Sequence, residues 1–473
     1  MQRRSAIAFA VGGWLNLLGC SPNAVRASST DVAGGGSSAG TMPASGNTGA
    51  DPIGGTATSG SSGAGGRSTG DGGVAGLAAA AGGGNGGVGG GRSAEIAFSK
   101  LQLNAQFFSE GINVADLNND QVLDIVTGPF WYAGPDFLRQ RAFRQPATKP
   151  FDVKGDSDCY AVFSADFNAD GWLDIVSLRA LGGSEAVWYE NPKTDVGYWT
   201  EHVAFSGVND ESAALVDIDG DGKPELATVS QGFGGFVKPA WGAVGTNWSF
   251  AKVTAQGAWG PFTHGIGAGD VNGDGREDLL LPEGWWEQPV TWTEQPWAEH
   301  PAKFWGKALP DESYGGAQMF AYDVDGDGDS DVVTSLQAHG WGLAWFEQQA
   351  GTFVEHTIMA TRAEEAQYGV AFAQPHAVAV ADIDGDGLKD IVTGKRKGAH
   401  GVGLGSELDA PAVLYWFKLV RTPGSLARFE PHLIDSVAGV GTQVVIADVD
   451  GDQRPDILTS ARAGAFLFRS TQP

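Results

Sequence analysis

The sequence is poor in cysteine and in basic residues. Its 473 residues include 2 cysteines, and neither a C-x-x-C pair nor a Cys/His pair at zinc spacing occurs. A disulfide framework and a zinc finger are therefore excluded. Lys and Arg number 30 against 56 Asp and Glu, which gives a formal net charge of −26. This charge argues against binding to nucleic acid or to anionic lipid, and it requires cations that neutralise the carboxylates.

The apolar run at the N-terminus is too short to span a membrane. Arg3 and Arg4 precede about 13 apolar residues, whereas a spanning helix needs about 20. The pattern predicts a signal peptide over residues 1–19. The end of this segment, Leu17-Leu-Gly-Cys20, resembles a bacterial lipobox, which implies lipidation at Cys20. The alternative is an ordinary signal peptide followed by an incidental cysteine.

Glycine is in excess, with 72 residues, and it dominates residues 20–93 together with Ser, Ala and Thr. Such a segment cannot bury enough apolar surface to offset its ordering entropy, so it is predicted to be a flexible tether. Its root-mean-square reach is roughly 45–50 Å. Ser21 after the lipobox resembles lipoproteins of an outer membrane. We therefore expect an exported protein at the outer membrane or cell surface of a Gram-negative bacterium, with its lipid as the only membrane contact.

Residues 94–473 contain seven aspartate-rich loops at intervals of 50 to 66 residues. A small-residue or β-branched run precedes each loop, and an apolar strand follows it. Aromatic runs such as Trp345-Phe-Glu-Gln348 predict a third strand, and Phe353 with His356 is typical of a fourth. Four strands at this period predict an all-β fold, a seven-bladed β-propeller. We interpret the repeated aromatic residues as blade-packing residues rather than as a ligand cage.

The number of strands at the two chain ends predicts how the ring closes. After Asp456 only two strands remain, while residues 96–103 precede the first loop without a blade of their own. The N-terminal strand is therefore predicted to complete the last blade, which removes an open sheet edge. Residues 94–473 are expected to form one closed, monomeric propeller, with Cys159 as a lone, inert thiol.

The loops share the frame D-x-[DN]-x-D-x-x-x-[DE]. Ca²⁺ takes six to eight oxygen ligands, and clustered carboxylates repel one another without a cation. A solvated turn explains one such loop but not seven in frame. The frame resembles the FG-GAP or VCBS repeat family of calcium-binding β-propellers. Gln121 and Gln453 depart from it, because glycine is usual at the sixth position.

That resemblance implies up to seven structural Ca²⁺ sites. Their ligands would be the side chains at positions 1, 3, 5 and 9 of each loop, namely Asp116, Asn118, Asp120 and Asp124; Asp166, Asn168, Asp170 and Asp174; Asp217, Asp219, Asp221 and Glu225; Asp270, Asn272, Asp274 and Asp278; Asp323, Asp325, Asp327 and Asp331; Asp382, Asp384, Asp386 and Asp390; Asp448, Asp450, Asp452 and Asp456.

Four of the eight histidines, His264, His339, His376 and His400, lie outside the repeated outer strand. The residues six positions before each first aspartate would form a ring at the other mouth of the channel, roughly 20 Å from the calcium loops. This ring comprises Glu110, Tyr160, Glu211, His264, Ala317, His376 and Thr442. The second strands end beside it, at Arg179, Gln231, Glu283, Gln337, Lys395, Arg396 and Arg462.

Two interpretations of this mouth stay open. It is either a solvated polar rim or a pocket for a sugar or another small polyol, with His or Glu as proton carriers. A divalent ion held by the histidines with Glu110, Glu211 or Glu283 is an additional hypothesis.

A second resemblance bears on the pocket. Gln337-Ala-His-Gly340, Gln374-Pro-His-Ala377 and Asp390-Ile-Val-Thr-Gly-Lys-Arg396 are similar to the propeller portion of aldos-2-ulose dehydratase-type enzymes, which eliminate water from ketosugars. The resemblance implies that His264, His339 or His376 abstracts a proton and that Lys395 or Arg396 stabilises the enolate. Those enzymes also carry cupin domains, which this chain lacks.

The sequence therefore leaves two functions open. One is a tethered, calcium-dependent binding or adhesion module for a glycan or a surface protein. The other is a carbohydrate lyase with its site at the channel mouth. A peptidase is disfavoured, because neither a Ser nucleophile elbow nor an H-E-x-x-H motif occurs.

Overall fold

The computed structural model describes residues 96–471, apart from 180–183, 195, 258, 261, 306–314 and 399–405. All of these residues belong to one compact unit, Gly73–Pro473. The predicted signal peptide, the lipidation site at Cys20, the tether over 20–93 and His400 lie outside the described residues. Within the described part of the chain, no helix has the length and apolar character needed to cross a bilayer.

Strands account for nearly all regular structure. In chain order they are β1 (Ala97–Asn104), β2 (Ile112–Ala115), β3 (Asp124–Thr127), β4 (Phe130–Ala133), β5 (Arg139–Ala142), β6 (Ala161–Ala165), β7 (Asp174–Arg179), β8 (Glu185–Glu190), β9 (Thr200–Ser206), β10 (Ala214–Val216), β11 (Glu225–Ser230), β12 (Phe233–Lys238), β13 (Ser249–Lys252), β14 (Gly267–Gly269), β15 (Asp278–Leu281), β16 (Gly284–Glu287), β17 (Ala298–Pro301), β18 (Met319–Tyr322), β19 (Asp331–Ser335), β20 (Leu343–Gln349), β21 (Thr352–Met359), β22 (Pro375–Ala381), β23 (Asp390–Lys395), β24 (Leu414–Val420), β25 (Arg428–Asp435), β26 (Val444–Ala447), β27 (Asp456–Ala461) and β28 (Gly464–Thr471). A 3₁₀ turn, Arg362–Glu364, leads into α1 (Glu365–Tyr368) between β21 and β22.

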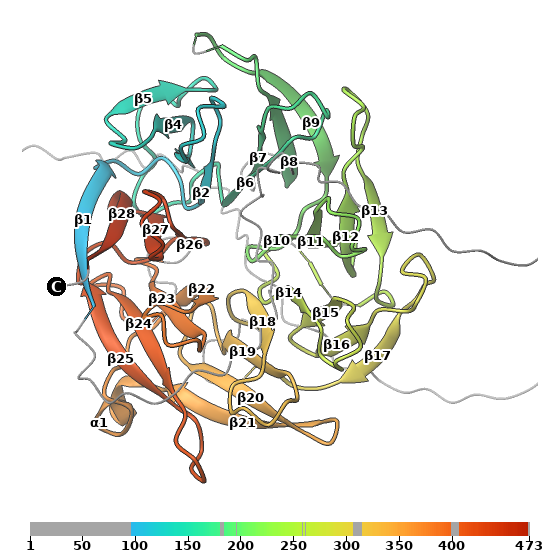
Figure 1. Ribbon diagram of the computed structural model, residues 1–473, viewed down its shortest axis with the longest axis vertical. Coiled ribbons are helices and arrows are strands. Elements are labelled where there is room, and N and C mark those ends of the chain that lie inside the picture. Colours follow the sequence, from blue (N-terminus) through green and yellow to red (C-terminus); the bar gives the residue numbers. More distant parts are fainter. Residues whose placement is uncertain are drawn as a thin grey trace, which may run out of the picture. The chain divides into compact units, whose positions relative to one another are not determined.

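These strands build antiparallel meanders around a common centre, with β2, β6, β10, β14, β18, β22 and β26 innermost (Figure 1). The prediction of an all-β propeller is confirmed. Five sheets have four strands each, and one has eight, in the order β17-β16-β15-β14-β18-β19-β20-β21. The sequence predicted separate four-stranded blades throughout, so the eight-stranded sheet is a difference.

Small residues explain why two meanders join. The inner strands β14 and β18 pair in parallel, with Gly267 opposite Met319. A Cβ on Gly267 would lie 2.0 Å from the Met319 carbonyl oxygen, and one on Gly269 would lie 2.5 Å from the Ala321 Cβ. Only glycine permits this approach of two backbones.

The chain ends meet in one sheet, in the order β1-β28-β27-β26. β1 pairs with β28 in antiparallel fashion, from Ala97 opposite Thr471 to Asn104 opposite Ala465. The predicted completion of the last sheet by the N-terminal strand is therefore confirmed. β28 lies between β1 and β27, so its backbone groups are paired on both sides.

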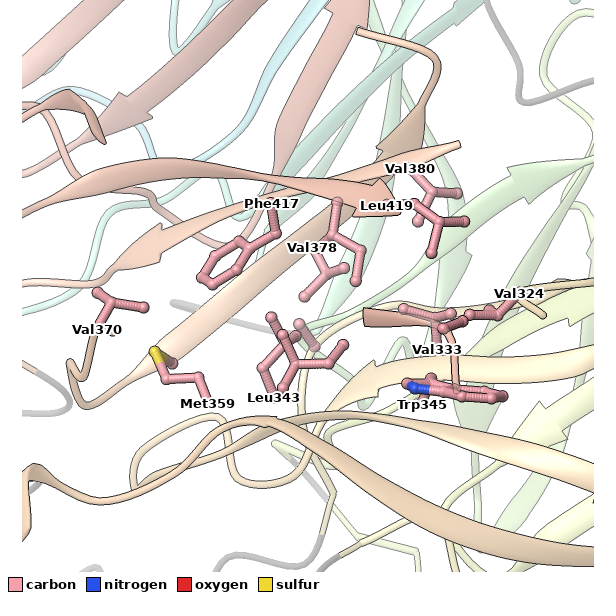
Figure 2. Packing of buried hydrophobic residues seen from close by; sticks show 14 of the residues in the cluster. Val324, Val333, Leu343, Trp345, Met359, Val370, Val378, Val380, Phe417 and Leu419 are labelled. Atoms are coloured by element: carbon pink, nitrogen blue, oxygen red, sulfur yellow. The ribbon is translucent and has the colours of Figure 1, made fainter. Parts of the chain in front are cut away.

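Apolar side chains fill the space between neighbouring meanders. In one such layer Leu343 and Trp345 of β20 face Val378 of β22 and Phe417 of β24 (Figure 2). Four outer-strand histidines stack on the buried tryptophans of the third strands, with ring centroids 3.9 to 4.6 Å apart: Trp188 with His202, Trp285 with His300, Trp345 with His356 and Trp416 with His432. The repeated aromatic residues are thus packing residues, as predicted.

Candidate functional site

Four side chains from four meanders converge at the end of the inner strands opposite the aspartate loops. The His376 Nε2 lies 3.2 Å from the Nε2 atoms of both His264 and His339. The Glu211 Oε2 lies 3.2 Å from the His376 Nε2 and 3.7 Å from the His264 Nε2. All four donor atoms fall within 4.8 Å of one another. We call this group the histidine cluster.

The position of each member follows from the repeat. Glu211 precedes β10, His264 precedes β14 and His376 lies at the start of β22, all at the same offset from their aspartate loops. The equivalent residue before β18 is Ala317, whose side chain is too short to reach the centre. His339, which follows β19 in the same meander, completes the group. The cluster is therefore a departure from the repeat in four consecutive meanders.

The donor set suits a divalent transition ion. Burial and the neighbouring Arg396 charge lower the pKa of His376 to about 3, so its imidazole is neutral and keeps a lone pair. Its Nδ1 is buried and has no hydrogen-bond partner among the described residues. Three imidazole nitrogens and one carboxylate match Zn²⁺ and similar ions rather than Ca²⁺, which prefers oxygen.

An arginine–carboxylate network lies beside the histidine cluster. Arg396 Nε and Arg462 Nη1 donate to the Glu110 Oε1 over 2.7 and 2.8 Å, and Arg396 Nη2 contacts Asp156 Oδ1 at 3.1 Å. Burial alone would raise the pKa of Glu110, but the two guanidinium groups outweigh it and hold that pKa below its ordinary value. Arg396 also approaches Glu211 at 4.0 Å, which links the network to the cluster.

The ring predicted at the channel mouth is buried. Glu110, His376, Ala317 and Thr442 are 0% exposed, and Glu211, Tyr160 and His264 are at most 3% exposed. The alternative of a solvated rim therefore does not describe these residues. Half-buried His339 is the member of the cluster nearest to solvent.

Other predicted residues make their contacts elsewhere. Arg179 binds Glu201 and Tyr189 on its own sheet. Glu283 accepts a hydrogen bond from the Trp259 indole. Gln337 accepts one from the Trp341 amide. Lys395 donates to the carbonyl oxygens of Ala373 and Ser406, and burial lowers its pKa to about 8. The structure does not bring these four side chains into the histidine cluster.

The aspartate loops form a second set of candidate sites. In four of them the carboxylates at positions 1, 3 and 9 lie within 4.8 Å of one another: Asp217, Asp219 and Glu225; Asp323, Asp325 and Asp331; Asp382, Asp384 and Asp390; Asp448, Asp450 and Asp456. In the other three loops asparagine occupies position 3. Oxygen donors at this density suit Ca²⁺.

Position 9 has a further role that the loop frame did not indicate. Asp331 accepts the Val324 amide on one oxygen and the Gln348 amide on the other, both at 2.8 Å. Equivalent bonds recur at Asp124, Asp174, Asp278, Asp390 and Asp456. This buried carboxylate therefore fixes the loop to the third strand.

Comparisons with known proteins agree with this architecture. Residues 166–228 and 323–393, which include four of the seven loops, match the model of the FG-GAP-like repeat. The propeller contains FG-GAP-like repeats. No functionally curated protein matches the chain.

Solved structures similar to the FG-GAP-like propeller include the lectin BP39L from Burkholderia pseudomallei, at 16% identity over 80% of this chain and 96% of the lectin, with a TM-score of 0.41. A lectin from Agrocybe aegerita shares 14% identity over 80% and 91%, with a TM-score of 0.41. The rhamnogalacturonan lyase YesW shares 12% identity over 78% and 72%, with a TM-score of 0.39. These similarities are too low to carry an argument about function.

Proposed function

We propose that the protein is an exported, metal-dependent carbon–oxygen lyase acting on carbohydrates, with its site at the histidine cluster. The convergence of Glu211, His264, His339 and His376 carries the proposal. Structural histidines in this propeller stack on tryptophan, whereas these three direct their Nε2 atoms at one another. A divalent ion held there would polarise the carbonyl group of a ketosugar.

Two further groups would serve the elimination, in which a C–H bond and a C–OH bond break, a C=C bond forms and water leaves. Burial and nearby carboxylates, Glu211 first among them, raise the pKa of Tyr160, so its phenol keeps its proton. That hydroxyl is buried and has no hydrogen-bond partner among the described residues. The Glu211 carboxylate would accept the proton from the C–H bond, and Tyr160 would donate its proton to the departing hydroxyl group, which leaves as water. The Arg396 guanidinium would stabilise the enolate, and the proton on Glu211 would return to Tyr160.

A turnover assay tests this proposal. The zinc-loaded full chain is incubated with aldosuloses and 1,5-anhydro-D-fructose, and the ultraviolet absorbance of an enone product is followed. We expect turnover that His376→Ala abolishes. His356→Ala, in an outer-strand histidine, is the matched control and should retain it. Zinc-loaded, folded protein that produces no enone from any of these sugars would contradict the lyase.

The second candidate is the calcium-dependent binding module. It predicts saturable binding of a glycan or surface protein that disappears on chelation, without turnover. The density of carboxylates in the aspartate loops favours calcium as its structural ion. Glycan-array binding by the full chain, in calcium and in EGTA, tests it.

The eight-stranded sheet divides at the β14–β18 pair into two four-stranded meanders, each with its own aspartate loop. We propose that these are two blades of a seven-bladed ring.

The proposal also includes lipidation at Cys20, a flexible tether over residues 20–93, and a location at the outer membrane or cell surface. Mass spectrometry of the mature N-terminus tests the lipid.

A further inference from the structure

The aspartate loops differ in the residue that faces them from the third strand. When the register of the second and third strands is continued by one residue, the residue opposite position 9 is glutamate in three meanders: Glu190, Glu287 and Glu347. It is lysine in two others, where Lys238 stands opposite Glu225 and Lys418 stands opposite Asp390. Ala133 and Arg469 hold this place in the remaining two.

The glutamates bond to histidines of the outer strands, and Glu190 also accepts a hydrogen bond of 3.5 Å from Asn168 of its loop. Glu190, Glu287 and Glu347 contact the outer-strand histidines His202, His300 and His356 at 3.1, 2.9 and 2.6 Å. They bring no positive charge to the loops beside them.

The lysines bond into the loops. The Lys238 Nζ contacts Asp219 and lies 3.2 Å from the Glu225 Oε1 and 3.8 Å from the Asp221 Oδ2. Three of the four predicted calcium ligands in this loop therefore surround one ammonium group. The Lys418 Nζ contacts Asp384 and lies 2.9 Å from the Asp386 Oδ2.

Other cations near the loops reach more exposed carboxylates. The Arg469 Nε lies 3.8 Å from the Oδ2 of Asp450, a position-3 carboxylate whose side chain is 29% exposed. Lys193, Arg276 and Arg454 each reach the carboxylate at position 5, whose side chain is 21 to 27% exposed. The two lysines reach the deeper carboxylate at position 3, whose side chain is 8% exposed in Asp219 and 10% in Asp384. A cation at position 3 shares the space that Ca²⁺ would occupy.

We propose that the ammonium groups of Lys238 and Lys418 are the built-in cations of their two loops. These loops then hold their shape without Ca²⁺ and bind it far more weakly than loops that face glutamate. An entering ion must displace an ammonium group from the same oxygens and remain beside its charge, which is unfavourable at partly buried positions. The propeller therefore has two classes of loop that the shared aspartate frame conceals.

Calcium titration of the full chain tests this inference. Equilibrium dialysis with ⁴⁵Ca²⁺ counts the bound ions in the wild type, in Lys238→Met and in Lys418→Met. Each variant should gain one Ca²⁺ with at least tenfold higher affinity than any wild-type site in that loop. Lys193→Met, which removes a cation from position 5 only, is the control and should gain none. Unchanged stoichiometry and affinity in both lysine variants would overturn the inference.

Thermal melting of the double variant gives a second measurement. Removal of both ammonium groups leaves each loop with uncompensated carboxylates, so the double variant should depend more on calcium than the wild type does. We expect EGTA to lower its melting temperature further than that of the wild type. An equal EGTA effect on both proteins would count against the built-in cations. Neither experiment depends on turnover, so their outcome is independent of the proposed lyase.

Discussion

The two ends of the inner strands contrast in composition and in repetition. At one end every meander carries an aspartate loop built from oxygen donors, and most of these side chains are partly exposed. At the other end the residue six positions before each loop differs between all neighbouring meanders, and buried His, Glu, Tyr and Arg side chains meet. Residues that repeat hold each meander together. Residues that break the repeat are free to form one site on the axis.

The ends also differ in the cation that they suit. Carboxylate and amide oxygens favour Ca²⁺, whereas imidazole nitrogens favour zinc and its neighbours. Because the donor sets differ, the two ends can be emptied and altered separately.

The largest effect should come from the histidine cluster. His376→Ala removes the imidazole that contacts all three of its partners, so we expect at least a 100-fold loss of bound zinc, together with unchanged calcium. Elemental analysis of the purified full chain measures both. Zinc retained at one equivalent by His376→Ala would contradict a metal centre at this end.

Selective chelation should separate the ends next. EGTA removes Ca²⁺. For each loop whose free Ca²⁺ stood at 100 times the dissociation constant, this removal lowers the free energy of unfolding by about 2.7 kcal/mol. Several loops together should lower the melting temperature by about 10 °C or more. Because EGTA also binds zinc, a zinc-selective chelator is applied first, and it should change the melting temperature far less than the later addition of EGTA. Calorimetry with each chelator shows the difference, and an unchanged melt in excess EGTA would contradict structural calcium.

The arginine network should give the largest effect of a single substitution on stability. Glu110→Gln leaves Arg396 and Arg462 buried with less negative charge, which costs about 3–5 kcal/mol. Because the pKa of Glu110 is lowered in the fold, this contribution is complete above its ordinary value of 4.5 and is lost as the pH falls through the folded value. Urea unfolding of the wild type and of Glu110→Gln, at pH 7 and at lower pH, measures the difference in their free energies of unfolding. This difference should become smaller in acid.

The smallest effect should come from an outer-strand histidine. His356→Ala removes a ring stacked on Trp345 and a bond to Glu347, which together are worth about 1 kcal/mol. Urea unfolding should show this modest loss without a change in bound zinc. If His356→Ala lost as much zinc as His376→Ala, the histidines of the outer strands and those of the histidine cluster would not differ in metal binding.

Repetition made the fold predictable from the sequence. The aspartate frame gave the inner hairpins, and the aromatic runs gave the outer strands. The leftover residues 96–103 predicted the pairing of β1 with β28. The merging of two meanders was not predicted, since it depends on the approach of Gly267 to the Met319 backbone, which no sequence period encodes.

The site was predictable only in part. The offset from the loops placed Glu211, His264 and His376 on one ring, and the departure of His339 from the outer strand marked it as unusual. Asp156 was missed, because it lies in an irregular segment and meets Arg396 across 240 residues. Lys395 is the last residue of β23 and Arg396 follows it, and neighbouring side chains in extended backbone point to opposite sides, so the two cations separate.

The pairing of β1 with β28 has a consequence for the order in which the ring is made. Ala97 and Thr471 are bonded across 374 residues of sequence, so during synthesis β1 waits for β28. Until β28 emerges, β1 has no partner and β27 remains a sheet edge. A stop codon that removes β28 would therefore leave β1 without a partner and β27 as a sheet edge, whereas an equally short deletion in an outer loop would spare this pairing.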